Sequence, residues 1–176
     1  LTVLLAVFAN VLAPYDIAEQ DLFGRRALPS LEHLLGQDIY GRDILSRLLF
    51  GARSTLIAGV VCVAFAGVIG SLLGLISGYF EGMVGNAIMR FMDLMMSFPL
   101  FLLAILIVAI LGPGLMNAVI AVGVTTIPNY ARVVRGQTLT LKNSQYIEAA
   151  RAMGASDLQI MFWHILPNAI GPLIVL

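Results

Sequence analysis

Charged side chains are scarce in this sequence, and their scarcity disfavours a soluble protein. They make up 11% of the 176 residues, whereas an ordinary soluble domain carries roughly 25%. A soluble fold of this size needs a polar surface that so few charges do not supply. The ten basic and ten acidic side chains also cancel, so the net positive charge that attracts nucleic acid is missing and no nucleic-acid partner is expected.

Reactive and metal-binding groups are equally few. The one cysteine, Cys62, lies in an apolar run without a partner for an intrachain disulfide, so a packing role is expected. His33 and His164 lack partners at metal-ligand spacing, and the sequence has no Gly-x-x-x-x-Gly-Lys-Ser/Thr loop for ATP. We therefore expect no metal, no cofactor and no catalytic residue. A membrane-bound enzyme is disfavoured because no titratable groups converge.

Long hydrophobic segments are what the sequence has instead, since 60% of its residues are hydrophobic. Five segments stand out: residues 1–13, 55–80, 94–111, 115–131 and a fifth that begins near residue 158. The second segment carries no charge and is long enough to cross the ~30 Å hydrocarbon layer of a bilayer. Strands are not expected, because no ten-residue alternating segments recur. The sequence predicts an all-α, polytopic membrane protein in contact with lipid.

Both ends of the sequence lie in apolar segments. We expect residues 1–13 to be the end of a first membrane helix. The alternative is the core of a signal peptide, but a charged leader and a suitable cleavage site are missing. Because the last segment stops within an apolar run, the complete protein is expected to contain further helices.

Residues 14–54 form the longest polar stretch. Its second half, residues 38–53, has the pattern of an amphipathic helix. The pairs Asp38/Arg42 and Asp43/Arg47 have the acid four residues before the base, the favourable order for helical ion pairs. Such a helix either lies in the membrane interface before the chain turns inward at Thr55, or packs on neighbouring protein.

Two features inside the apolar segments indicate helix packing and a helix kink. Gly70, Gly74 and Gly78 fall on one helix face, where another backbone can approach closely. That partner is a helix of this chain or of a second subunit. Pro128 removes one backbone donor from a later helix, and Thr125, Thr126 and Asn129 surround it. These polar residues either line a transport path or belong to a structural kink.

The polar stretch over residues 143–167 predicts a helical elbow. Asn143 or Ser144 is placed to cap a short helix that ends before Gly154, which suits a left-handed helix end. Ser156 and Gln159 then form a capping box for a second helix that becomes apolar. The first helix is too short to be stable alone and too polar to enter lipid. It therefore needs a protein surface to rest on.

Two motifs in this sequence resemble one family. The elbow residues Glu148-Ala149-Ala150, Gly154 and Leu166-Pro167 resemble the EAA motif of permease subunits in bacterial binding-protein-dependent ABC importers. The pattern departs at His164, where the motif has Ile, with Ile165 one place later. Residues 35–38, 41–47 and 51–53 resemble the signature of the dipeptide, oligopeptide and nickel branch of these permeases. Together the motifs bracket nearly the whole chain.

The resemblance implies a helical bundle of the type I importer permease, with six membrane helices in the full protein. Residues 14–54 would be periplasmic and residues 55–176 would hold the core spans. The loop over about residues 132–157 would face the cytoplasm of a bacterial inner-membrane protein. The coupling residues implied are Glu148, Ala149, Ala150, Arg151, Gly154, Leu166 and Pro167.

The resemblance also implies partners and a function. The partners would be a homologous second permease, two ATP-hydrolysing subunits and a periplasmic solute-binding protein. The permease would form half of the path for peptides or similar small solutes and would not hydrolyse ATP itself. A secondary transporter or channel is the competing hypothesis. It predicts charges within the membrane spans and a repeated half, and the sequence shows neither.

Overall fold

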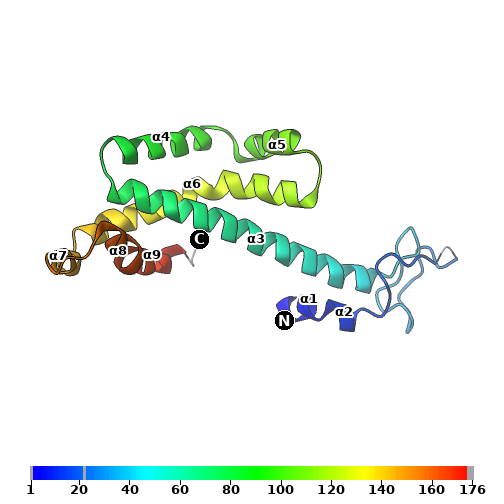
Figure 1. Ribbon diagram of the computed structural model, residues 1–176. Helices are drawn as coiled ribbons and strands as arrows, with labels where there is room; N and C mark the ends of the chain where they lie inside the picture. The colour runs from blue at the N-terminus through cyan, green and yellow to red at the C-terminus, as the bar shows by residue number, and fades with distance from the viewer. Residues whose placement is uncertain (1, 22, 174–176) are drawn as a thin grey trace. The chain divides into compact units, whose positions relative to one another are not determined.

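The computed structural model describes residues 2–21 and 23–173, and these residues are mainly helical (Figure 1). Within them the only strand-like pairing is an isolated bridge between Gln37 and Asp43. The prediction of an all-α fold is confirmed. Internal contacts divide the chain into two units, residues 1–60 and 61–176, and each unit is described by itself.

The first unit contains α1 (Thr2–Val7), α2 (Ala9–Leu12), an irregular loop and the beginning of α3 (Ile44–Tyr79). Asn10 of α2 accepts a hydrogen bond of 3.0 Å from Arg53 of α3. The backbone N–H of Tyr15 donates to Ser46 Oγ at 3.2 Å. The segment after α2 is thereby attached to the first turns of α3.

Two aspartates organise the loop before α3. Asp38 pairs with both Arg42 and Arg47. Burial raises the pKa of Asp38, but the backbone N–H groups of Arg42 and Tyr40 and the Arg42 guanidinium outweigh it and lower this pKa to about 2. Asp43 accepts from the Ser46 backbone N–H at 2.7 Å and from His33 Nδ1 at 3.0 Å. It therefore caps the beginning of α3.

The prediction of a separate amphipathic helix over residues 38–53 is wrong in two respects. Residues 38–43 are loop, so the Asp38–Arg42 pair forms in a turn, and Arg47 pairs with Asp38 rather than Asp43. From Ile44 onward the helix continues for 36 residues without a turn at Thr55. The local sequence is compatible with a continuous helix, because no proline interrupts it and the Ser54 and Thr55 hydroxyls are satisfied by carbonyls four residues earlier.

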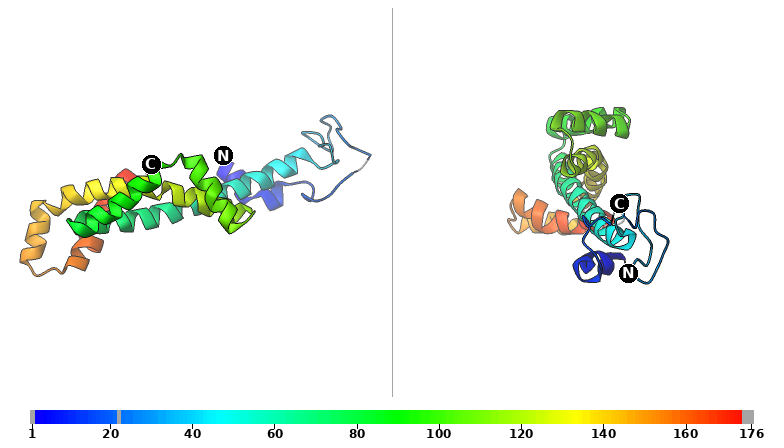
Figure 2. Two further views of the ribbon diagram at one scale, coloured as in Figure 1. Left: turned by 90° about the horizontal axis from the view of Figure 1, so that it is seen from above. Right: turned by 90° about the vertical axis from the view of Figure 1, so that its right-hand side faces the viewer.

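The second unit is a bundle built on α3 and α6 (Leu115–Lys142), with α4 (Met83–Ser97) and α5 (Leu100–Leu111) packed along α6 (Figures 1 and 2). Among the described helices, α3 alone is long and apolar enough to cross a membrane. The pair α4 and α5 satisfies the same criterion together, bent by 96°. The apolar segment expected over residues 94–111 is thus divided, because Pro99 begins a new helix at Leu100.

The glycine stripe of α3 packs against α6 of the same chain. A Cβ atom at Gly74 would lie 2.5 Å from the Ala131 carbonyl oxygen, and one at Gly70 would lie 2.8 Å from the Ile127 carbonyl oxygen. At Gly78 it would meet Thr138 Cβ at 2.7 Å. Of the two partners expected from the sequence, the structure places a helix of this chain against these glycines.

The two threonines before Pro128 bond carbonyls of the preceding helical turn. Thr125 donates to the Val122 carbonyl at 2.8 Å, and Thr126 donates to the Gly123 carbonyl at 2.9 Å. Pro128 removes the usual donor to the carbonyl of residue 124. Neither threonine hydroxyl bonds that carbonyl, since both bond carbonyls earlier in the helix. Thr125 is buried in the bundle, whereas Asn129 is exposed.

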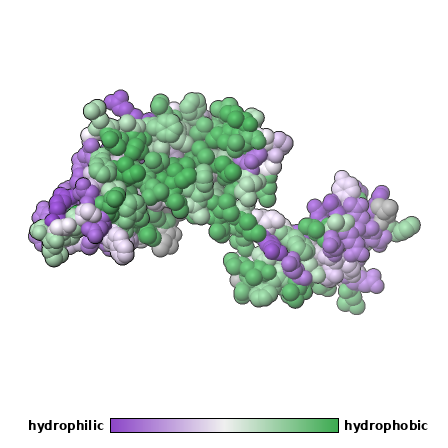
Figure 3. Space-filling model, in the orientation of Figure 1, coloured by the Kyte–Doolittle hydropathy of each residue, from purple (hydrophilic) through white to green (hydrophobic). Residues whose placement is uncertain are grey.

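Apolar side chains cover most of the visible face of the second unit, and polar side chains gather at its end around α7 (Gln145–Ala152) (Figure 3). On α5 none of the twelve residues is buried. A surface of this composition matches hydrocarbon as its solvent. The polar end is where the candidate site lies.

Candidate functional site

The candidate site is an elbow formed by α7, a turn at Gly154 and α8 (Asp157–Gln159). It follows directly from α6, which continues to Lys142. The polar segment predicted as a loop over about residues 132–157 is therefore helical up to residue 142. Its first part extends α6, and the elbow proper begins at Asn143. The short helix is thus held at the end of a long one.

The two faces of α7 differ sharply. Ile147 is fully buried and Ala150 is 5% exposed, and Ile147 packs in a core cluster with residues of α3, α6 and the C-terminal helices. Glu148, Ala149 and Arg151 are exposed. Two of the three residues of the Glu-Ala-Ala motif therefore face outward, while Ala150 fixes the helix to its own chain.

Gly154 ends α7 in the geometry that the sequence predicts. Its φ is +89°, in the left-handed region. The Gly154 N–H donates to the Arg151 carbonyl at 3.0 Å, and the Ala155 N–H donates to the Ala150 carbonyl at 3.1 Å. These two bonds are those of a Schellman motif. Glycine suits the position because a left-handed backbone costs residues with a Cβ atom free energy.

The second arm of the elbow begins with the predicted capping box. Ser156 Oγ accepts from the Gln159 N–H, and the Gln159 side chain accepts from the Ser156 N–H at 2.9 Å. At the start of α7, Ser144 occupies the capping position, but its hydroxyl donates to the Leu141 carbonyl instead. The side-chain cap expected at that end does not form in the described structure.

The chain then passes through a π-helical segment (Ile160–Ile165) into α9 (Leu166–Leu173). The wide turn precedes Pro167, which has no N–H to donate. Ile165 is fully buried, whereas His164 is only half-buried. Ile165 therefore occupies a core position, one residue after the place where the motif has its Ile. Leu166 packs against the same core cluster, and Pro167 is exposed.

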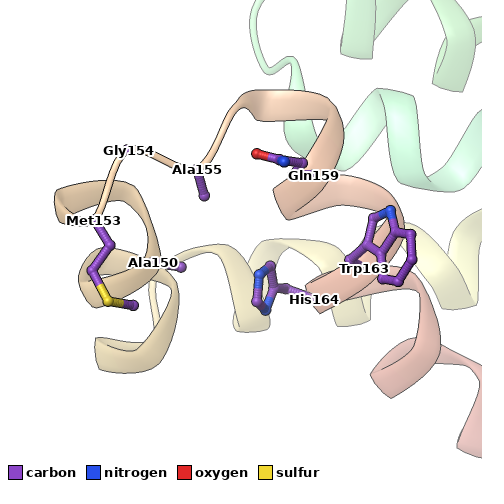
Figure 4. A pocket seen from close by; sticks show the side chains of 7 residues that line it. All are labelled: Ala150, Met153, Gly154, Ala155, Gln159, Trp163 and His164. Atoms are coloured by element: carbon purple, nitrogen blue, oxygen red, sulfur yellow. The ribbon is translucent and has the colours of Figure 1, made fainter.

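A groove of about 710 Å³ lies inside the elbow (Figure 4). Its lining consists of Ala150, Met153, Gly154, Ala155, Gln159, Trp163 and His164. Met153 is 84% exposed and Trp163 is 80% exposed. Large apolar side chains this exposed beside a polar helix are typical of a surface that another protein covers.

The other predicted residues lie away from the elbow. A smaller pocket of about 230 Å³ between α3 and α6 is lined by Cys62, Val63, Thr126, Asn129 and Tyr130. It brings together two of the three polar residues predicted around Pro128. Thr125 is not part of it.

The geometry defines a helical membrane protein that presents a short, half-exposed helix at the polar end of its bundle. Residues 70–176 match the family described as the binding-protein-dependent transport system inner membrane component. The chain belongs to this family. It is therefore an inner-membrane component. The elbow lies within the matched region, and the end of the span α3 overlaps it.

Individual relatives are similar over nearly the whole chain. The glutathione transport system permease protein of Pectobacterium atrosepticum is 47% identical over 176 residues, which cover 99% of this chain and 58% of that protein. The dipeptide transport system permease protein of Alkalihalophilus pseudofirmus is 43% identical over 98% of this chain and 57% of its own length. The chain thus spans somewhat more than half the length of these relatives.

Sequence reasoning missed the groove and the side chains that close it. In the sequence Met153 and Trp163 are ordinary apolar residues. Only the fold brings them to the same groove, one from each arm of the elbow. The one available signal was their position beside the motif. Their exposure depends on how the two arms are folded against each other, which no local pattern encodes.

Proposed function

We propose that the full-length protein is the membrane-spanning permease subunit of an ATP-driven importer for peptides or similar small solutes. The observation that carries the proposal is the elbow, in which α7 shows Glu148 and Ala149 outward from a chain of the inner-membrane transport family. ATP hydrolysis takes place in separate subunits. The relatives named for glutathione and for dipeptides support a peptide as the solute.

The elbow is the contact with the ATP-hydrolysing subunit. Glu148 offers an exposed carboxylate for an ion pair, and the small side chain of Ala149 lets the helix approach a partner closely. The groove beside it, with Met153 and Trp163 at its rim, offers the apolar area that a stable interface needs. The elbow thus lies on the cytoplasmic side, and the loop before α3 lies in the periplasm.

Transport follows from a difference in contacts between two states. When two ATPase subunits close on ATP, the elbows that they hold move with them. The helices of this chain and of a homologous second permease then change between inward-facing and outward-facing arrangements. A periplasmic solute-binding protein delivers the solute to the open side.

The small pocket between α3 and α6 belongs to the solute path in this proposal. The exposed Asn129 amide and the Tyr130 side chain face the same pocket as Thr126. Amide and hydroxyl groups match the hydrogen-bonding groups of a peptide backbone. Thr125 is excluded from contact with solute because it is buried and its hydroxyl bonds a carbonyl of its own helix.

Charge reversal at the elbow tests the proposal. In the assembled complex, Glu148→Lys is expected to weaken retention of the ATPase about ten-fold or more, because it replaces an attraction with a repulsion at an interface. The measurement is the amount of ATPase that co-purifies with the permease at increasing salt. Glu19→Lys, the same change on an exposed acid of the first unit, is the matched control and should leave retention unchanged.

If the protein were a secondary transporter or channel, the expected result of charge reversal would be the opposite. Such a protein has no ATPase to retain, so uptake would continue without ATP and Glu148→Lys would leave it unaffected. Equal retention of the ATPase by both charge-reversed proteins would show that α7 is not the docking element.

A further inference from the structure

Tyr79, the last residue of α3, lies at the junction between this long helix and the elbow. Its side chain is 5% exposed and packs in the core cluster with Ile147 of α7 and Ile160 of the π-helical segment. No motif in the sequence marks this tyrosine. Its ring is held by packing, so the position of its hydroxyl is fixed by the core.

The Tyr79 hydroxyl bridges the two arms of the elbow. It donates to Oδ1 of Asp157, the first residue of α8, and it accepts from Nη2 of Arg151 at 3.2 Å. Arg151 is in the last turn of α7. Because Gly154 lies between these two residues, one hydroxyl joins both sides of the turn to the end of α3.

Lys142 strengthens the same junction from α6. Its Nζ donates to the Tyr79 carbonyl at 2.8 Å and to Glu81 Oε1 at 3.0 Å, and lies 5.5 Å from the Tyr79 ring centroid. A cation at a helix C-terminus is favourable, because the last carbonyls carry partial negative charge. The ends of α3 and α6 and both arms of the elbow therefore meet at Tyr79.

The turn at Gly154 does not provide this connection itself. Gly154 is exposed, and a Cβ atom built there would meet no side chain within 4 Å. The two arms share apolar packing, because Ile147 of α7 lies in one core cluster with Ile160 and Ile165. Apart from the Schellman bonds, the polar link between α7 and the second arm within the described residues is an exposed bond of 3.2 Å from the Tyr146 hydroxyl to the His164 carbonyl. Apolar packing is non-directional, so the angle between the arms under force depends on the polar bonds that join them.

We propose that Tyr79 is a positioning residue that makes the elbow and α3 move as one body. The inference rests on the proposed function, since it concerns how movement of a bound ATPase reaches the membrane span. The shared hydroxyl carries displacement of α7 to α8 and to the end of α3 together. In its absence the displacement is absorbed at the Gly154 turn, and the ATPase moves without the span.

The test measures whether the elbow and α3 keep a constant separation during ATP turnover. Spin labels are placed at Ala152 of α7 and Val68 of α3, both exposed, in the full complex with Cys62→Ser. In the unaltered complex the distance distribution should stay narrow and unchanged when ATP and vanadate are added. With Tyr79→Phe, which keeps the ring and removes the hydroxyl, a shifted or second distance should appear with nucleotide.

Two further variants keep the test decisive if Tyr79→Phe fails to fold. Asp157→Ala, at an exposed position, removes the acceptor of the Tyr79 hydroxyl and should reproduce the nucleotide-dependent shift. Combining it with Tyr79→Phe should add nothing, because Tyr79→Phe already removes this bond. Tyr146→Phe removes an elbow hydroxyl that does not reach α3 and should change nothing. Distributions identical to those of the unaltered complex in both Tyr79→Phe and Asp157→Ala would overturn the inference.

The same experiment separates this inference from the proposed function. If no ATPase is retained by the unaltered permease, the proposed function fails. If the ATPase is retained and hydrolyses ATP while Tyr79→Phe and Asp157→Ala leave the distances unchanged, the proposed function stands and the role of Tyr79 does not.

Discussion

Replacing Gly154 with valine is expected to disrupt the elbow and to abolish most ATP-driven transport. The φ of +89° at this position costs a β-branched residue about 1–3 kcal/mol. Because that cost must be met whenever the native turn forms, the equilibrium constant for forming the native elbow should fall about ten-fold or more. The measurement is ATPase retention by the purified permease, together with the rate of solute uptake in vesicles.

A graded series at Gly154 separates backbone strain from crowding. No heavy atom outside its own neighbourhood lies within 4 Å of a Cβ atom built on Gly154, so size alone should matter little. Asparagine tolerates the left-handed region better than valine, and Gly154→Asn should retain intermediate activity. Gly136→Val is the matched control, since Gly136 lies in α6 with equally open space and no positive φ. Equal activity for Gly154→Val and Gly136→Val would contradict the assignment of the turn.

Substituting leucine for Gly74 is expected to prevent stable folding of the bundle. A Cβ atom there would lie 2.5 Å from the Ala131 carbonyl oxygen and 2.8 Å from Val134 Cβ, and the former is a backbone atom that cannot rotate away. Separating α3 from α6 enough to fit leucine should cost at least about 1–3 kcal/mol. The permease should therefore show a lower thermal transition in detergent and a lower yield in the membrane.

The same helix provides the control for Gly74. Gly59 is also in α3, but a Cβ atom there would meet no heavy atom within 4 Å, so Gly59→Leu should leave stability almost unchanged. Gly74→Ala should lie between the two. If Gly74→Leu and Gly59→Leu have equal thermal transitions, α3 and α6 are not in contact through the glycine stripe.

Features that depend on a few neighbouring residues could be predicted from the sequence. The left-handed end at Gly154 and the capping box of Ser156 and Gln159 are set by side chains within one helical turn, and the structure confirms both. The Gly70, Gly74 and Gly78 stripe was also readable, because spacing alone puts these residues on one face. The helix that packs against this stripe could not be predicted, since spacing does not say which helix backbone contacts the glycines.

Features that depend on distant contacts were missed or misjudged. The hydrogen bond between Tyr79 and Asp157 joins residues 78 positions apart, and no local pattern predicts it. The expected helix over residues 38–53 was misplaced because an amphipathic pattern does not distinguish a separate helix from the first turns of a longer one. Asp43 decides the boundary by capping α3, and the carboxylate takes this role while bonded to His33.

The side of the membrane on which the elbow lies is the most direct test of the coupling role. Cysteines are introduced singly at Ala152 of α7 and at Leu28 of the loop before α3, both exposed, with Cys62→Ser. Intact cells are then treated with a maleimide that does not cross the inner membrane. The proposal predicts labelling of Leu28→Cys in intact cells and labelling of Ala152→Cys only after the inner membrane is opened and the ATPase is removed from it. Labelling of Ala152→Cys in intact cells would place α7 outside the cytoplasm and contradict a coupling role.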